Sequence, residues 1–240
     1  MGEGEQRGHV SRQHPPSMAA VALLALATTA WLPQFQLPQL GVQKPAAAVE
    51  LRDALVAGQS DMSTLAPLAD ACADARVRFD AKLLADGALW RATSIVRGEV
   101  PRWERNARLL PFLANRAGQA YSLGGGGGGG GSVTNYGEVL GRGLYFKACG
   151  TFAPAPKQTS SDRCPQDFTV AITEGGFVLG GAPFLSSAIS GPGFLRILYV
   201  DEDIRIFESP KDSPDRWEEA GLVVVQVRDD LFDDPVVGDL

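Results

Sequence analysis

The stretch that decides the fold is PGFLRILYVDEDIRI at residues 192–206, followed by GLVVVQVR at residues 221–228. Mainly apolar residues occupy 194–200 and 204–207, with Arg196 and Arg205 among them, and flank the turn Asp201-Glu202-Asp203. A third apolar run covers 222–227 and ends at Arg228. Short β-branched and aromatic runs bounded by turn residues are typical of strands. The C-terminal third therefore predicts an antiparallel hairpin and a last strand.

The same kind of pattern extends back to residue 87. Further strands are predicted at 89–96, 144–152, 168–173 and 177–179, with weaker candidates at 120–123 and 133–139. Glycine and proline separate these runs, and nothing after residue 111 reads as a long helix. Eight or nine short strands predict a mainly β, lipocalin-like antiparallel barrel of about eight strands over residues 87–228.

The run of eight glycines, 124–131, is predicted to be a hairpin loop within this barrel. It matches a phosphate-binding glycine pattern only trivially, because no Lys-Ser or Lys-Thr pair follows it and no helix opens after it.

Two other segments precede the barrel. Residues 49–86 have helical spacing, with Leu51 and Leu55 one turn apart and Asp61 or Ser63 available as a cap. Residues 18–32 are uncharged and apolar, but such a helix spans only ~22 Å, short of a ~30 Å hydrocarbon core. With the small residues 46–48 as a processing site, residues 1–48 are predicted to be a targeting presequence. Residues 229–240 are predicted to be a solvated acidic tail.

Composition excludes several classes of function. The formal net charge is −6, whereas a nucleic-acid binder needs a basic face. Three cysteines are too few for a disulfide scaffold. Three free thiols are predicted, with a Cys149–Cys164 bridge as the alternative, and no zinc spacing is present.

Both histidines, His9 and His14, lie in the predicted presequence, so the processed chain would contain none. Their loss would exclude Ser-His-Asp and Cys-His catalysis and remove the commonest metal ligand. The acids at 201–203 are interpreted as a solvated turn, because Asp favours turns through local hydrogen bonds. The sequence therefore predicts a protein that is not an enzyme and has no cofactor.

The C-terminal motifs resemble those of the plastid lipid-associated protein (PAP/fibrillin) family. The shared features are a Gly-x-Leu strand that starts at Gly193 and ends in Tyr-x-Asp at Asp201, then an acidic turn, Ile-Arg-Ile, and a last strand closing on Arg228. Residues 207–220 form a longer insert than the family has. The resemblance implies a chloroplast protein with a transit peptide. It also implies binding of an isoprenoid, quinone, carotenoid or acyl lipid, and association with thylakoids or plastoglobules.

The alternation of side chains along a strand assigns candidate site residues. Arg196 is expected to face outward, which places Leu195, Ile197 and Tyr199 inside, where we expect them to line a ligand cavity with Phe146 and Phe168. Simple core packing is the alternative for each of these five residues.

Three further residues are given structural or ligand-orienting roles. Arg205 is expected to pair with Asp201 or a neighbouring acid, with contact to a ligand head group as the alternative. Trp90 and Arg228 are expected to meet where the barrel closes, the guanidinium stacking on the indole.

Three functions remain open from the sequence. The leading one is a non-catalytic carrier or binder of apolar lipid. The second is a barrel enzyme that uses a pair of carboxylates on a lipid or pigment. The third is a solid barrel that serves as an interaction module in a thylakoid complex.

Overall fold

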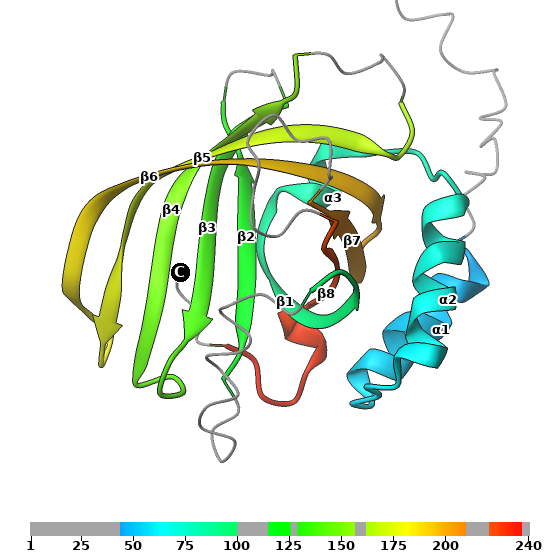
Figure 1. Cartoon of the computed structure of the whole chain (residues 1–240), viewed down its shortest axis with the longest axis horizontal. Helices are drawn as coiled ribbons and strands as arrows, with labels where there is room; N and C mark the ends of the chain where they lie inside the picture. The colour runs from blue at the N-terminus through cyan, green and yellow to red at the C-terminus, as the bar shows by residue number, and fades with distance from the viewer. Residues whose placement is uncertain (1–43, 100–114, 126–128, 157–161, 210–220, 237–240) are drawn as a thin grey trace, which may run out of the picture. The chain divides into compact units, whose positions relative to one another are not determined.

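A computed structural model of the chain describes residues 44–99, 115–125, 129–156, 162–209 and 221–236. Its centre is one closed barrel of eight antiparallel strands in sequence order, with β8 returning to β1 (Figure 1). The mainly β fold predicted from the sequence is confirmed. The strands are β1 Asp86–Arg97, β2 Ala117–Leu123, β3 Gly131–Glu138, β4 Leu144–Pro154, β5 Gln166–Leu179, β6 Ala182–Val200, β7 Ile204–Glu208 and β8 Val223–Arg228.

Helices precede the barrel, as predicted. They are α1 (Ala46–Val56), α2 (Met62–Asp74) and α3 (Ala81–Leu84), and a short 3-10 turn, η1 (Asp229–Leu231), follows β8. Asp61 caps α2 by accepting a hydrogen bond from the Ser63 N–H at 3.0 Å. The predicted presequence lies outside the described residues except for 44–48. Because α1 begins at Ala46 and Ala48 is fully buried, the predicted boundary after residue 48 falls inside a packed helix.

The hairpin of β5 and β6 is longer than predicted. Residues 168–173 and 177–179, expected to be two strands, belong to the single strand β5, and β6 includes residues 182–193. Gly176 continues β5 instead of ending it because the strands lie close there. A Cβ at this position would stand 2.0 Å from the Leu185 carbonyl oxygen. The turn comes at Gly180 and Gly181, both with positive φ, as a two-residue hairpin turn of this kind requires.

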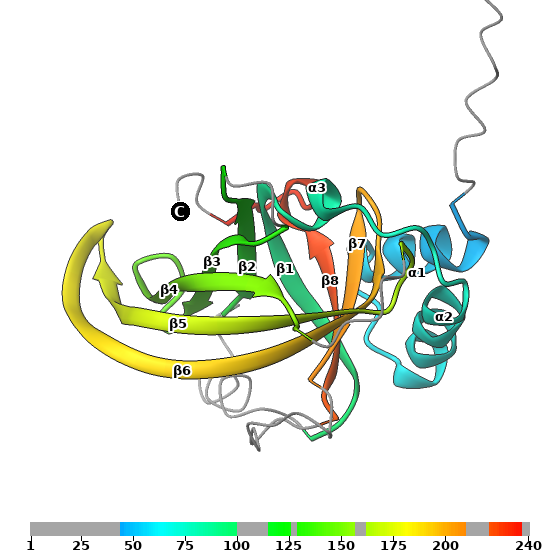
Figure 2. The ribbon, with the colours of Figure 1, turned by 90° about the horizontal axis from the view of Figure 1, so that it is seen from above.

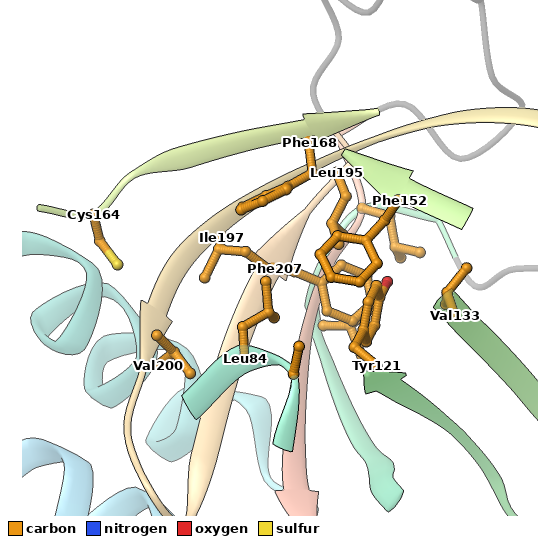
Figure 3. Close-up of a cluster of buried hydrophobic side chains, with 13 residues drawn as sticks. Leu84, Tyr121, Val133, Phe152, Cys164, Phe168, Leu195, Ile197, Val200 and Phe207 are labelled. Carbon is orange, nitrogen blue, oxygen red and sulfur yellow. The ribbon is translucent and has the colours of Figure 1, made fainter. Parts of the chain in front are cut away.

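The buried side chains form two clusters on opposite faces of the strands. The inner cluster fills one end of the barrel and includes Phe168, Leu195 and Ile197, with Tyr121 and Phe152 in edge-to-face contact at 5.0 Å (Figure 3). The outer cluster lies between α1, α2 and strands β6 to β8, and includes Leu51, Leu65 and Ile206. Both faces of β7 and β8 are therefore buried, one by the barrel interior and the other by the helices.

A β-bulge in β6 corrects the predicted position of Tyr199. Ile197 pairs with Phe207 and Tyr199 with Ile206, so Leu198 is an extra residue between the two pairs. One extra residue reverses the alternation of side chains. Tyr199 therefore packs in the outer cluster beneath the helices, and Val200 takes the inner position.

The sequence predicts that the acidic turn between β6 and β7 is solvated, and this prediction is wrong because Asp201 and Asp203 have protein partners. Asp203 accepts hydrogen bonds from Lys44 Nζ at 2.5 Å and Arg52 Nη1 at 2.8 Å. Asp201 accepts from the Tyr199 hydroxyl at 2.8 Å and from backbone N–H groups of the turn. The turn therefore fastens α1 and the residues before it to the barrel.

The acidic tail is likewise bound where the structure describes it. Arg91, on the outer face of β1, bonds Asp229 at 2.8 Å and Asp234 at 3.0 Å, and its guanidinium lies 4.0 Å from the Phe232 ring centroid. Asp234 also bonds Arg116. The sequence predicts a solvated tail because the tail is acidic. In the structure, Asp229 and Asp234 form ion pairs with Arg91 and Arg116, which the sequence pattern does not connect with the tail.

The three cysteines are free thiols, as predicted, and two of them, Cys72 and Cys164, are buried. The glycine run connects β2 to β3, which matches the hairpin loop expected from the sequence. Over the described parts of the chain, none of the helices combines the length and apolar character that crossing a bilayer needs.

Candidate functional site in the barrel interior

The inner surface of the barrel continues beyond the packed cluster onto the long β5–β6 hairpin. Phe146 on β4 pairs in register with Phe177 on β5, and their rings meet at 5.4 Å. With three more side chains they form an apolar wall that faces inward but is left partly exposed: Phe146, Phe177, Leu179, Leu185 and Ile189. The hairpin that carries this wall lies on the opposite side of the barrel from α1 and α2 in both views (Figures 1 and 2).

Space is left beside this wall. Gly137 on β3 pairs with Phe146, and a Cβ built on Gly137 meets no described atom within 4 Å. At Gly191 on β6, the only such contact is the Cβ of Ile172, 3.8 Å away. Two positions of the inner surface thus face room that the described side chains leave unfilled.

Arg205 lies on the inner side of β7 and is 1 % exposed. Its Nε donates to the side-chain oxygen of Gln226 on β8, and its Nη2 donates to the Gln119 carbonyl at 3.2 Å. The guanidinium also lies 4.8 Å from the Tyr121 ring centroid and 5.2 Å from that of Trp90. This group is referred to below as the Arg205 centre: Trp90, Gln119, Tyr121, Arg205 and Gln226.

The expected pairing of Arg205 with Asp201 is wrong. Successive residues of a strand point to opposite faces, and here Ile204 and Ile206 face the helices while Arg205 faces the interior. The carboxylate of Asp201 lies on the helix side, where Tyr199 and Lys44 hold it. Arg205 therefore has amide partners in place of an acid.

Trp90 and Arg228 meet at the closure of the barrel, as expected, since they are opposite each other in the β1–β8 pairing. The stacking is weaker than predicted, because the Arg228 guanidinium is 5.9 Å from the indole centroid. Arg228 instead bonds Asp86 at 2.8 Å and Asp230 at 3.1 Å. Arg205 makes the closer contact with Trp90.

Burial alters the acidity of the two ionisable groups of the centre. Desolvation lowers the pKa of Arg205 to about 10, although the nearby Tyr121 and Asp86 act in the opposite direction. Desolvation raises the pKa of Tyr121, against the influence of Arg205. Arg205 is therefore a cation and Tyr121 a neutral phenol at physiological pH.

The remaining predicted residues divide between the site and its surroundings. Leu195, Ile197 and Phe168 face inward but belong to the packed cluster, while Phe146 belongs to the apolar wall. Gly193 lies in β6 opposite Val170. The clustered acids Asp201, Glu202 and Asp203 lie in the β6–β7 turn and not on the inner face of the barrel, and Asp201 and Asp203 have the partners named above.

Sequence reasoning missed the amides of the Arg205 centre, although one signal was present. Gln226 interrupts the run Val223-Val224-Val225-Gln226-Val227, and pairing β7 with β8 sets Gln226 opposite Arg205. Gln119 gave no such signal, because β2 is a weak pattern. Among the described residues, no cluster of three or more His, Cys, Asp or Glu is arranged to hold a metal ion.

The fold and this interior define the protein as a closed eight-stranded antiparallel β-barrel with a cationic centre in its core. No protein-family model, curated protein or solved structure matches the chain.

Proposed function

We propose that this protein is a non-catalytic lipid-binding protein that holds an apolar small molecule inside its barrel. The ligand classes are an isoprenoid, a quinone, a carotenoid or an acyl lipid. The observation that carries the proposal is the apolar wall, with large side chains such as Phe177 and Ile189 facing inward yet 36 % and 37 % exposed. Residues that face a packed core are usually covered by other side chains, so an inward face left half-bare suits a ligand.

Burial of a ligand's apolar surface against this wall would provide enough free energy for measurable binding. Each methylene buried against the wall contributes about 0.8 kcal/mol, so about ten of them support micromolar binding after the cost of ordering the ligand.

We further propose association with a lipid surface. Residues 175–195 contain no charged side chain, and the backbone N–H of Gly180 in the β5–β6 turn donates to Gly143 in the β3–β4 turn at 2.9 Å. These two turns bring exposed apolar side chains together in a tip patch: Val139, Leu140, Leu179, Phe184 and Leu185. An exposed, uncharged apolar patch on a projecting hairpin is suited to a lipid phase, which can surround it on both faces.

The PAP/fibrillin resemblance supports the same function and adds a location, the chloroplast, with thylakoids or plastoglobules as the surface. Leu179 and Leu185 belong to both the apolar wall and the tip patch, so a ligand could pass from the lipid to the interior without crossing water.

The test is mass spectrometry of organic extracts from natively purified protein. A stoichiometric apolar molecule that co-purifies with the protein, and is absent from a mock purification, is the expected result. Protein that carries none, and that binds no isoprenoid or acyl probe when titrated, excludes the carrier.

One observation favours a second function, the solid-barrel interaction module. The inner cluster fills one end of the barrel with side chains that are all less than 10 % exposed. If that packing extended to the whole interior, the barrel would have no room for a ligand. The exposed tip patch would then serve as a docking surface for a partner protein. Capture of the protein by vesicles of plastid galactolipids, without any protein partner, is the result that separates the two functions in favour of lipid.

A further inference from the structure

Two hydrogen-bond donors of the Arg205 centre have no acceptor. Nη1 of Arg205 and Nε1 of Trp90 are both buried and have no hydrogen-bond partner among the described residues. Trp90 is 0 % exposed and Arg205 is 1 % exposed, so solvent does not supply the missing acceptors directly. A buried donor without an acceptor is costly, and more so when it is charged.

Among the described residues, no carboxylate forms a hydrogen bond with the charged Arg205. Its hydrogen bonds go to Gln226 and to the carbonyl and side-chain oxygens of Gln119, and none of these acceptors is a carboxylate. The guanidinium carbon lies over the rings of Trp90 and Tyr121, but a cation–π contact does not supply an acceptor for its N–H groups. A buried charge is ordinarily paired.

The centre is connected to the open part of the interior. Gln119 contacts Arg205 on one side and donates to Asn135 Oδ1 at 2.9 Å on the other. Asn135 is half-buried and lies next to Gly137 along the inner face of β3, where the described residues leave space. The polar centre and the apolar wall are thus two ends of one inner surface.

We propose that Arg205 and Trp90 bind the carboxylate of an apolar monocarboxylic acid whose chain lies along the apolar wall. A carboxylate offers two oxygens for the two unused donors and supplies the negative charge that Arg205 lacks. A neutral carbonyl would satisfy the donors but leave the charge unbalanced. This inference rests on the proposed function and names the ligand class for it.

The experiment compares three ligands of equal chain length by isothermal titration calorimetry on the full chain: palmitic acid, hexadecanol and methyl palmitate. The acid is expected to bind about tenfold or more tightly than the other two, as a charge-assisted hydrogen bond provides. Equal binding of all three overturns the carboxylate site and leaves the proposed function standing. Absence of binding by all three also overturns the carboxylate site, and the co-purification test then decides the proposed function separately.

Matched variants locate the effect. Arg205→Gln is expected to abolish the preference for the acid, whereas Arg228→Gln, which removes the other guanidinium near Trp90, is expected to keep it. Loss of the preference in both variants, or in neither, contradicts the proposal. Trp90→Phe keeps an aromatic ring but removes Nε1, and a smaller loss of preference is expected. The comparison of the three ligands on the unaltered protein decides the matter even if a variant does not fold.

Discussion

At the scale of the residue, Trp90 lies between two arginines with different partners. Arg228 has carboxylates on the rim and is 5.9 Å from the indole centroid, whereas Arg205 is 5.2 Å from it and has only amides. A guanidinium beside an aromatic ring gains about 0.5–2 kcal/mol, most where both are desolvated. Arg228, which has carboxylate partners, is therefore assigned a structural role. Arg205, which has none within hydrogen-bond distance, is suited to binding a ligand.

The pair of Lys44 and Asp203 predicts a pH dependence. Burial alone would raise the pKa of Asp203, but hydrogen bonds from Lys44 and Arg52 hold it below its ordinary value. A carboxylate with a lowered folded pKa stabilises the fold above its unfolded pKa, and this stability is lost as the pH falls through the folded value. Lys44→Met is expected to cost about 1 kcal/mol at neutral pH and much less at an acid pH low enough to protonate Asp203, which lies below the ordinary aspartate range because the folded pKa is lowered.

Urea denaturation at both pH values measures this effect. Arg78→Met is the control, because Arg78 forms a largely exposed ion pair with Asp162 at 3.9 Å and is expected to change stability at neither pH. An equal cost of Lys44→Met at both pH values would show that the lysine acts through packing alone.

Two glycines of the barrel strands, Gly137 on the inner face of β3 and Gly176 on the outer face of β5, predict opposite outcomes for one substitution. At Gly176 a side chain would meet the Leu185 backbone at 2.0 Å, so Gly176→Val is expected to destabilise the protein by about 2 kcal/mol or more. At Gly137 there is room, so Gly137→Val is expected to leave stability unchanged or raise it by about 0.5–1 kcal/mol. The same valine should fill ligand space and weaken binding, which titration of the co-purified ligand measures. Unchanged binding would place the ligand elsewhere.

At the scale of the element, the sequence predicts the strands whose structure is decided by their own residue pattern. It does not predict features that depend on contacts with other elements. The hairpin of β6 and β7 and the last strand are apolar runs around an acidic turn, so their existence could be predicted. The length of β6 could not, because its Gly, Ser and Pro residues resemble loop composition. The bulge at Leu198 has no periodic signal, so the side of Tyr199 was mistaken. Arg205 was misplaced because the helices bury the outer face of β7, a tertiary effect.

Helix α1 predicts a dependence on the residues just before it. A chain that begins at Val49 lacks the ion pairs of Lys44 and the buried Ala48. It is expected to unfold about 1–3 kcal/mol more easily than a chain that begins at Lys44. Thermal unfolding of the two chains measures this difference. Equal stabilities would show that α1 needs only its later residues, Leu51 and Leu55, to dock.

The β5–β6 hairpin predicts vesicle binding that depends on its tip. Phe184 and Leu185 are 60 % and 59 % exposed, so replacing both with Ser removes apolar contact with lipid without opening a cavity. Flotation with galactolipid vesicles is expected to fall severalfold, while stability stays within about 0.5 kcal/mol. Val56→Ser is the control, since Val56 is 39 % exposed on α1, on the opposite side of the barrel. Equal loss in this control would mean that binding follows general hydrophobicity.

At the scale of the whole molecule, two buried thiols report on unfolding. Desolvation raises the pKa of Cys72 and of Cys164 to about 12, and only the thiolate is nucleophilic. In native buffer near neutral pH, iodoacetamide is expected to modify Cys149, which is half-buried, and to spare the other two. In denaturant all three should react. Mass spectrometry of the digested protein measures each site, and native labelling of Cys164 at the rate of Cys149 would show that the barrel opens there.

The mismatch in length between β6 and β7 has a consequence for self-association. β6 has 19 residues and β7 has five, and β7 pairs with β6 only over residues 196–200. Over residues 182–195, β6 therefore presents a backbone edge that no described strand covers. Such edges invite other chains to add a strand. Pro183 and Pro192 lie in this part of β6 and have no backbone N–H, and proline within sheets is found mainly on such edge strands. The prolines therefore disfavour edge-to-edge pairing of this hairpin with a second copy, which is compatible with the lipid contact proposed for its tip.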